Sequence, residues 1–374
     1  MLFSCRSAMA ARSNVVSIKR SAAPHRQFTV DIHCHVHTPA ADALVKPAFD
    51  PASEPMAKFS NDATRKVNRE QTQNVWSMLT SVETRLKDMD KMGIDYQAIS
   101  PAPFQYFYAV EPALGLQAAR LVNENIAGIV AAHPDRFVGL GTVPLQNTEL
   151  AVAELERAVK QLGLRGVEIC TNVAGAELSE ARFRPFFAKA EELDVVVFMH
   201  PGGFTHGERL SDHYFSNLIG NPLDSTVAVS HLIFGGVLDA YPKLKLVVAH
   251  GGGFLPAYSG RMDHAHGARS DCQREIPKKK PTSYLKKLYF DTIVFTHHQL
   301  AYLVEQWGAD HIVLGTDYPY DMGMYDPVAF VGGARTLSRD AKTKIVGGNA
   351  AKLLKIKAPK AKPKTKPIKK RAKR

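Results

Sequence analysis

The stretch that decides the fold is Phe28–Pro39, which reads Phe-Thr-Val-Asp-Ile-His-Cys-His-Val-His-Thr-Pro. Its β-branched residues predict a short buried strand, and the side chains of a strand alternate between two faces. His33 and His35 therefore point to the same side, as two ligands of one metal ion must. Cys34 lies between them and points the other way, so we interpret it as a packed apolar residue.

Three more polar residues each end an apolar run later in the chain. His200 follows Val-Val-Val-Phe-Met, His250 follows Leu-Val-Val-Ala, and Asp317 follows Ile-Val-Leu-Gly-Thr. Titratable groups at the ends of apolar strands are costly to bury unless they serve a shared site. Three imidazoles and one carboxylate suit a divalent metal, Zn²⁺ with Mn²⁺ as an alternative, and leave an open position for water. We expect the ligands to be His33, His35, His200 and Asp317.

A separate role is expected for His250, because an imidazole titrates near neutral pH and can act as a general acid/base beside the metal. The glycines at 251–253 let backbone and substrate approach closely. Two alternatives remain for His250: a fifth metal ligand, or a structural histidine at a glycine-rich turn.

Strand-like apolar runs alternate with helical patterns from Phe28 to Leu354. Eight short strands without polar alternation indicate a parallel sheet that is buried on both faces. The count favours an α/β fold of the closed (β/α)8 TIM-barrel type over an open sheet, and the carboxyl ends of its strands would form the site. After the first strand, we expect the others at 96–100, 137–143, 166–170, 195–200, 244–250, 288–293 and 312–317.

Composition indicates a globular protein. Of its 374 residues 45% are hydrophobic and 22% are charged, and no apolar run approaches the length of a membrane span. The four cysteines form no Cys-x-x-Cys pair, so neither a zinc knuckle nor a disulfide framework is indicated. A reducing, cytoplasmic location fits this pattern.

The net charge of +12 is concentrated at the chain ends. Residues 1–27 form a basic extension that we expect to be disordered, with an organelle transit peptide as the alternative interpretation. Residues 355–374 form a Lys/Pro-rich tail that we expect to be disordered and solubilising, with no specific nucleic-acid partner. Between them lies one expected domain at 28–354. The polar stretch 38–73 carries four prolines and is expected to be a lid or insertion on the face where the first strand ends.

Five motifs, in order along the chain, closely resemble the branch of the amidohydrolase superfamily typified by aminocarboxymuconate-semialdehyde and γ-resorcylate decarboxylases. The resemblance implies a distorted (β/α)8 barrel with one divalent metal that decarboxylates a small unsaturated or aromatic carboxylic acid without O2. It also implies the ligand and acid/base roles given above. The motifs are Asp-Ile-His-Cys-His (31–35), Phe-Met-His-Pro (198–201), Ala-His-Gly-Gly-Gly (249–253), Gly-Thr-Asp-Tyr-Pro (315–319) and Gly-Asn-Ala-Ala-Lys-Leu-Leu (348–354).

The same resemblance implies a homodimer and three arginines that hold a substrate carboxylate. Arg69, Arg261 and Arg269 match these positions, and Arg261 would reach across the dimer interface; guanidinium groups suit carboxylates geometrically. The chain departs from the pattern after His200, where Gly202-Gly203-Phe204 replaces an aromatic residue and an acid. Two rival interpretations remain: a hydrolase or hydratase of a small carboxylated substrate on the same barrel, and a catalytically silent barrel that binds partners through its tail.

Overall fold

The computed structural model describes residues 27–357 and contains eight parallel strands in two sheets. Nearly all of the two expected tails, 1–27 and 355–374, therefore lies outside the described residues. One sheet has the order β1-β2-β3 and the other the order β10-β9-β8-β7-β4. The strands are β1 (Val30–Val36), β2 (Tyr96–Pro101), β3 (Phe137–Gly139), β4 (Gly166–Ile169), β7 (Val196–Met199), β8 (Lys245–Val248), β9 (Tyr289–Asp291) and β10 (Ile312–Val313).

Two single parallel bridges join these sheets into a closed barrel. Gly141 pairs with Val167 on one side, and Cys34 pairs with Tyr318 on the other. A hydrogen bond of 2.9 Å from the Ile32 N–H to the Leu314 carbonyl strengthens the second join. The expected (β/α)8 barrel is therefore confirmed, and β3 and β10 are shorter than the runs 137–143 and 312–317 that predicted them.

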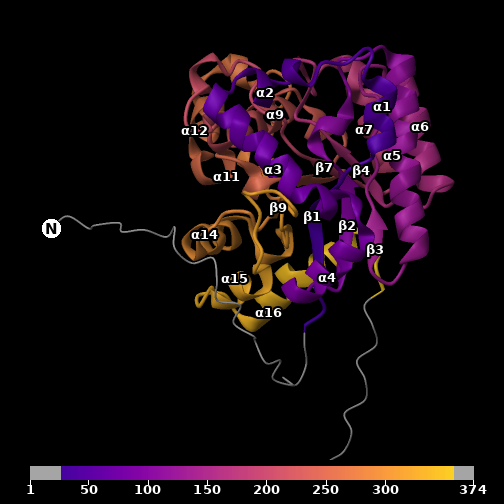
Figure 1. Cartoon of the computed structure of the whole chain (residues 1–374). Coiled ribbons are helices and arrows are strands. Elements are labelled where there is room, and N and C mark those ends of the chain that lie inside the picture. Colours follow the sequence, from indigo (N-terminus) through magenta and orange to yellow (C-terminus); the bar gives the residue numbers. More distant parts are fainter. Residues whose placement is uncertain (1–26, 358–374) are drawn as a thin grey trace, which may run out of the picture.

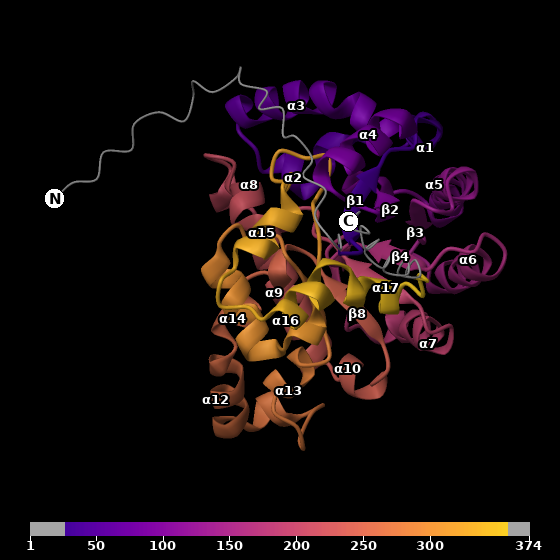
Figure 2. The same cartoon turned by 90° about the horizontal axis from the view of Figure 1, so that it is seen from below.

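The strands are buried on both faces, as their continuous apolar runs predicted. Inside the barrel Val30, Ile32, Val196, Phe198 and Val247 form one core cluster. A larger cluster fills the space between the strands and the surrounding helices. Figure 2 shows these helices around the strands from below. The main covering helices are α4 (Val82–Met92), α5 (Pro112–Ala132), α6 (Thr148–Lys160), α7 (Arg184–Glu192), α9 (Gly220–Phe234) and α14 (His297–Trp307).

Shorter elements complete the barrel. Between α16 (Arg339–Thr343) and α17 (Asn349–Leu353) lies a π-turn at Lys344–Gly348, where Gly347 packs directly on the backbone of Phe28. After it, Leu353 packs on the barrel interior. The other shorter helices are α8 (Phe215–Leu218), α10 (Val237–Ala240), α11 (Leu255–Tyr258), α12 (Gly260–Ala268), α13 (Thr282–Leu285) and α15 (Pro327–Gly333), and β5 (Asn172–Val173) pairs with β6 (Ala176–Glu177) in a small hairpin.

The polar stretch 38–73 is largely helical. It contains α1 (Pro39–Val45), a 3₁₀ turn at Pro51–Ser53, α2 (Pro55–Lys58) and the first half of α3 (Asp62–Thr80). The first residue of each of the first three is a proline, where its missing N–H has no helical partner to lose. In Figure 1, α2 and α3 lie in the upper part of the molecule, on the same side as α9 and α11. No helix within residues 27–357 is long and apolar enough to span a bilayer.

Candidate metal centre

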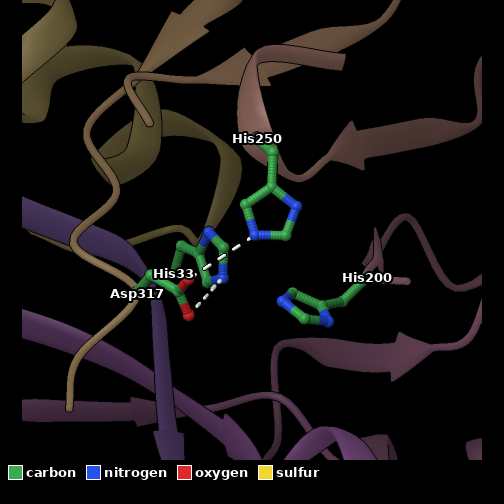
Figure 3. Close-up of side chains that lie close together, drawn as sticks. All are labelled: His33, His200, His250 and Asp317. Carbon is green, nitrogen blue, oxygen red and sulfur yellow. Dashed lines mark ion pairs between the residues drawn. The ribbon is translucent and has the colours of Figure 1, made fainter. Parts of the chain in front are cut away.

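Five titratable side chains converge at the carboxyl ends of the strands. His33, His200, His250 and Asp317 each offer a ligand atom, and these atoms all lie within 4.8 Å of one another. Figure 3 shows these four side chains around a common point. His35 joins them from β1, because its Nε2 lies 3.3 Å from Asp317 Oδ1. The structure thus brings together all four expected ligands and the expected acid/base.

Asp317 is the centre of this group. Its Oδ1 lies 3.3 Å from Nε2 of both His33 and His35. Its other oxygen, Oδ2, lies 3.5 Å from Nε2 of His250, as the dashed line in Figure 3 marks. Asp317 and His250 both have a φ of 55°, in the left-handed region that non-glycine residues rarely adopt. Such backbone conformations concentrate at functional sites.

Several atoms of these side chains have no hydrogen-bond partner and are available to a metal ion. Buried polar atoms in folded proteins almost always have a hydrogen-bond partner. Here several buried atoms of the five side chains have none, and a set of imidazole nitrogens and carboxylate oxygens fits a divalent ion such as Zn²⁺ or Mn²⁺. The atoms are Nε2 of His33 and His35, both ring nitrogens of His200, Nδ1 of His250 and Oδ1 of Asp317.

Hydrogen bonds on the far side of two rings turn their Nε2 atoms toward the centre. His35 Nδ1 lies 2.9 Å from the Pro101 carbonyl, which can only accept, so Nδ1 carries the hydrogen and Nε2 the lone pair. His33 Nδ1 lies 2.6 Å from Oδ2 of Asp291, a fully buried residue of β9. This carboxylate–histidine arrangement is the usual support of a metal-binding imidazole.

Asp291 also holds the backbone of the expected acid/base. Its Oδ2 accepts the His250 N–H at 3.0 Å, and its Oδ1 accepts the N–H groups of Gly251 at 2.8 Å and Ile293 at 3.1 Å. Asp291 could either support the metal centre or only pack inside the barrel. The four hydrogen bonds favour the supporting role.

The electrostatics of the centre depend on burial and on charge pairing. Burial lowers the pKa of His200 well below its usual value, and the neighbouring imidazoles lower it further, so this ring is neutral and ready to bind a metal. For His33, burial opposes the charged form, but Asp317 and Asp291 outweigh it and raise the pKa. Burial likewise opposes the charged Asp317, yet His33 and the other imidazoles hold its pKa well below the usual range. Metal binding would therefore displace a proton from the group.

Two buried carboxylates beneath the centre were missed by sequence reasoning. Asp31 accepts hydrogen bonds from Thr316 and Gln97, and burial raises its pKa to about 6. Glu168, on β4, is completely buried with its Oε2 3.6 Å from His35 Nδ1, and burial raises its pKa. Asp31 is the first residue of the motif that carries both histidines, which is the one signal that could have identified it.

The three expected arginines do not meet the metal ligands within one chain. Arg69 on α3, Arg261 on α12 and Arg269 after α12 are all exposed, and Arg269 pairs with Asp271 at 2.7 Å. In the described part of the chain no Lys or Arg lines the cavity beside the ligands. Their expected role stays a prediction.

Two cavities adjoin the centre. The inner one has a volume of about 50 Å³, and its lining includes His200, His250 and Asp317. A second, of about 670 Å³, is lined by residues of α8, α9 and α11, of the glycine-rich turn after His250 and of the loop after β9. His250 lines both, so the expected proton donor stands between the metal centre and the larger cavity. The residues that both cavities share are Asn217, Asn221, His250 and Met322.

Comparison with known proteins identifies several decarboxylases among similar sequences. The chain is 34% identical to 2-amino-3-carboxymuconate-6-semialdehyde decarboxylase of Dictyostelium discoideum over 289 residues, which covers 77% of this chain and 79% of the relative. It is 28% identical to γ-resorcylate decarboxylase of Polaromonas sp. over 292 residues, covering 75% of this chain and 89% of the relative.

Solved structures that are similar to this chain also include decarboxylases. The structure of 5-carboxyvanillate decarboxylase from Sphingomonas paucimobilis superposes with a TM-score of 0.78 at 26% identity and covers 89% of this chain and 100% of that one. Dihydroxybenzoic acid decarboxylase from Polaromonas sp., solved with manganese and the inhibitor 2-nitroresorcinol, has a TM-score of 0.75 at 25% identity, with 88% and 97% covered. The family model described as Amidohydrolase matches residues 30–356, and the chain belongs to this amidohydrolase family.

Proposed function

We propose that this protein is a metal-dependent carboxy-lyase that removes CO2, without oxidation, from a small unsaturated or aromatic carboxylic acid. The observation that carries the proposal is the convergence of unpartnered, buried imidazole and carboxylate atoms at the mouth of a barrel whose matched relatives are decarboxylases. No particular observation favours a hydrolase or hydratase. Because the matched relatives are decarboxylases, a barrel without catalytic activity is not favoured either.

In this proposal His33, His35, His200 and Asp317 hold one divalent ion. The donor set suits Zn²⁺, and the manganese in a related structure makes Mn²⁺ equally acceptable. When bound, the ion supplies a Lewis acid that polarises the substrate. Asp291 keeps His33 in the required tautomer through the 2.6 Å hydrogen bond.

His250 supplies the proton. When the bond between the carboxyl carbon and its neighbour breaks, the electron pair stays on the remaining carbon, which needs one proton as CO2 leaves. His250 is 16% exposed, and its Nε2 lies 3.5 Å from Asp317 Oδ2. A histidine at the boundary of the inner cavity can be reprotonated from solvent after each turnover.

We also propose a homodimer, in which Arg261 of the partner subunit would help to hold the substrate carboxylate. Arg261 is exposed on α12, next to an exposed apolar area on α8, α11 and the loop after β9. This area consists of Leu218, Phe254, Tyr258 and Phe295. Exposed apolar patches of this kind mark protein interfaces. The cytoplasmic location and the absence of a specific nucleic-acid partner stay predictions.

The test is CO2 release by the protein loaded with Zn²⁺ or Mn²⁺, measured against ortho-hydroxy aryl acids and carboxylated muconate semialdehydes. We expect His250→Ala to reduce release from the accepted acid by about 100-fold or more, the usual contribution of a general acid. His231→Ala is the control, because this histidine of α9 is 48% exposed and lines neither cavity. Stoichiometric metal without CO2 from any acid would contradict the proposal.

A further inference from the structure

The insertion and the glycine pair after His200 fit directly against each other. The Met56 N–H, in α2, donates to the Gly202 carbonyl at 3.3 Å. A Cβ on Gly203 would lie 2.6 Å from the Met56 nitrogen and 2.9 Å from its Cα, and Gly203 has a φ of +95°. Only glycine is compatible with both the conformation and the contact. The insertion at 38–73 and the glycine pair after His200 are therefore parts of one structure.

Further contacts fasten the insertion to the segment after Gly203. The Asn61 N–H donates to the Ser211 carbonyl at 2.9 Å. Ser60 Oγ donates to the Met56 carbonyl at 2.6 Å and lies 3.2 Å from Ser216 Oγ. Ser60 and Ser216 are both buried. These bonds hold α2 in a defined position above the strand ends.

In that position Met56 lines the inner cavity, together with Phe104 and Gly202. Its neighbours Pro55 and Glu54 line a different cavity, of about 460 Å³, on the other side of the helix. Phe104 and Gly202 line both cavities. Met56 is thus part of the wall of the small cavity at the metal centre, beside Phe104 and Gly202, which also line the much larger space.

We propose that Met56 is a specificity-determining residue, which contacts the substrate and excludes acids with a bulky substituent directed toward α2. This inference rests on the proposed decarboxylase function. A methionine thioether packs well on the face or edge of an unsaturated ring. The inner cavity, at about 50 Å³, is the smallest of the three described, so the bulk of the Met56 side chain in its wall limits what can enter. Removing the side chain would enlarge this cavity.

Binding of two nitrophenols to the Mn²⁺-loaded protein tests the wall without depending on turnover. The probes are 2-nitroresorcinol and the larger 4-hydroxy-3-methoxy-5-nitrobenzoic acid, measured by titration calorimetry. In Met56→Ala we expect the affinity for the larger probe to rise about tenfold relative to the smaller one, as for a pocket that gains room for a methylene or more. In Met56→Phe the ratio of the affinity for the larger probe to that for the smaller one should fall.

Lys58→Ala is the matched control, because Lys58 is exposed on the same short helix and does not line the inner cavity. It should leave the ratio unchanged, and thermal melting of each variant would verify its folding. An unchanged ratio in both Met56 variants, or no binding of either probe to any form, overturns the inference. Probe binding that responds to Met56, without CO2 release from any acid, would instead overturn the decarboxylase function alone.

Discussion

The floor and the roof of the site are built in different ways. The floor consists of His33, His35, His200, His250 and Asp317, and the roof consists of residues 51–61 packed on residues 202–218. Floor side chains are placed by paired parallel strands, whereas the roof is held by single hydrogen bonds and close contacts between loops far apart in sequence. In this architecture strand ends supply the chemistry and loops supply selectivity.

Buried carboxylates reveal the same difference. In the floor, imidazoles outweigh the effect of burial and lower the pKa of Asp317 and Asp291. Beside the roof, Asp224 of α9 accepts hydrogen bonds only from the neutral groups of Thr171 and Asn172, and burial raises its pKa to about 6. Asp317 and Asp291 are therefore charged beside the imidazoles, whereas the effect of burial prevails at Asp224, as it does at Asp31 and Glu168 beneath the centre.

The largest effect is expected from Asp317→Asn. The variant loses the negative charge that lies within 3.5 Å of three imidazoles, so metal affinity should fall by more than the roughly 100-fold typical of losing an outer-shell partner. Metal content after dialysis against a chelator measures this loss. Asp310→Asn is the control, because this carboxylate is 68% exposed and pairs with Lys344. Full retention of metal by Asp317→Asn would show that the Asp317 charge is not needed for metal binding, and the contrast drawn between a charged floor and the roof would be wrong.

Asp291→Asn should weaken metal binding by about 10–100-fold, as losses of outer-shell partners do. Both carboxylate oxygens accept from N–H groups, so one of them must become an NH2 that faces a donor. Competition with a chromophoric chelator measures the affinity. If the affinity stayed within twofold of the natural protein, Asp291 would have only a packing role.

Asp224→Asn should alter stability rather than metal binding. The raised pKa means that Asp224 binds its proton more tightly in the folded than in the unfolded state. The protonated carboxyl therefore contributes fully to the free energy of unfolding below about pH 4, and this contribution is lost as the pH rises through about 6. Asn cannot ionise, so the variant should gain about 1–2 kcal/mol over the natural protein between pH 4.5 and pH 8. Urea unfolding at the two pH values tests this, and a pH-independent difference would contradict it.

The smallest effect is expected from Gly207→Ala in the roof. A Cβ there would lie 2.7–3.0 Å from atoms of Phe59, so the ring must shift at a cost of about 1 kcal/mol. Hydrogen exchange should become faster in residues 51–61 while metal affinity stays unchanged. In contrast, Gly128→Ala in α5 adds a methyl group with no atom within 4 Å and should be neutral or stabilising. Altered metal affinity in Gly207→Ala would show that the two regions are coupled.

The floor could be predicted from the sequence because His33 and His35 share one face of the first strand, and His200, His250 and Asp317 each end an apolar run of a parallel strand. The roof could not. Residues 51–61 contain only a 3₁₀ turn and the four-residue helix α2, which are too short to show an apolar periodicity. The fit of Met56 on Gly203 joins positions with no shared local pattern. The prediction of the three arginines was based on similarity of motifs alone. The sequence does not indicate the position of a side chain on an exposed helix in the way that a strand end does.

The join between the first and last strands has a consequence for how the molecule assembles. The N–H groups of Thr316 and Asp317 donate to the His33 carbonyl at 3.2 and 2.8 Å, across 283 residues in the case of Thr316. Contacts of such long sequence separation carry the largest loop-closure entropy and form late. During synthesis the metal centre is incomplete until Asp317 has emerged, so the segment after β10 can pair with β1 only when nearly the whole barrel has been made. A divalent ion held by His33 and Asp317 would stabilise this contact and slow its reopening.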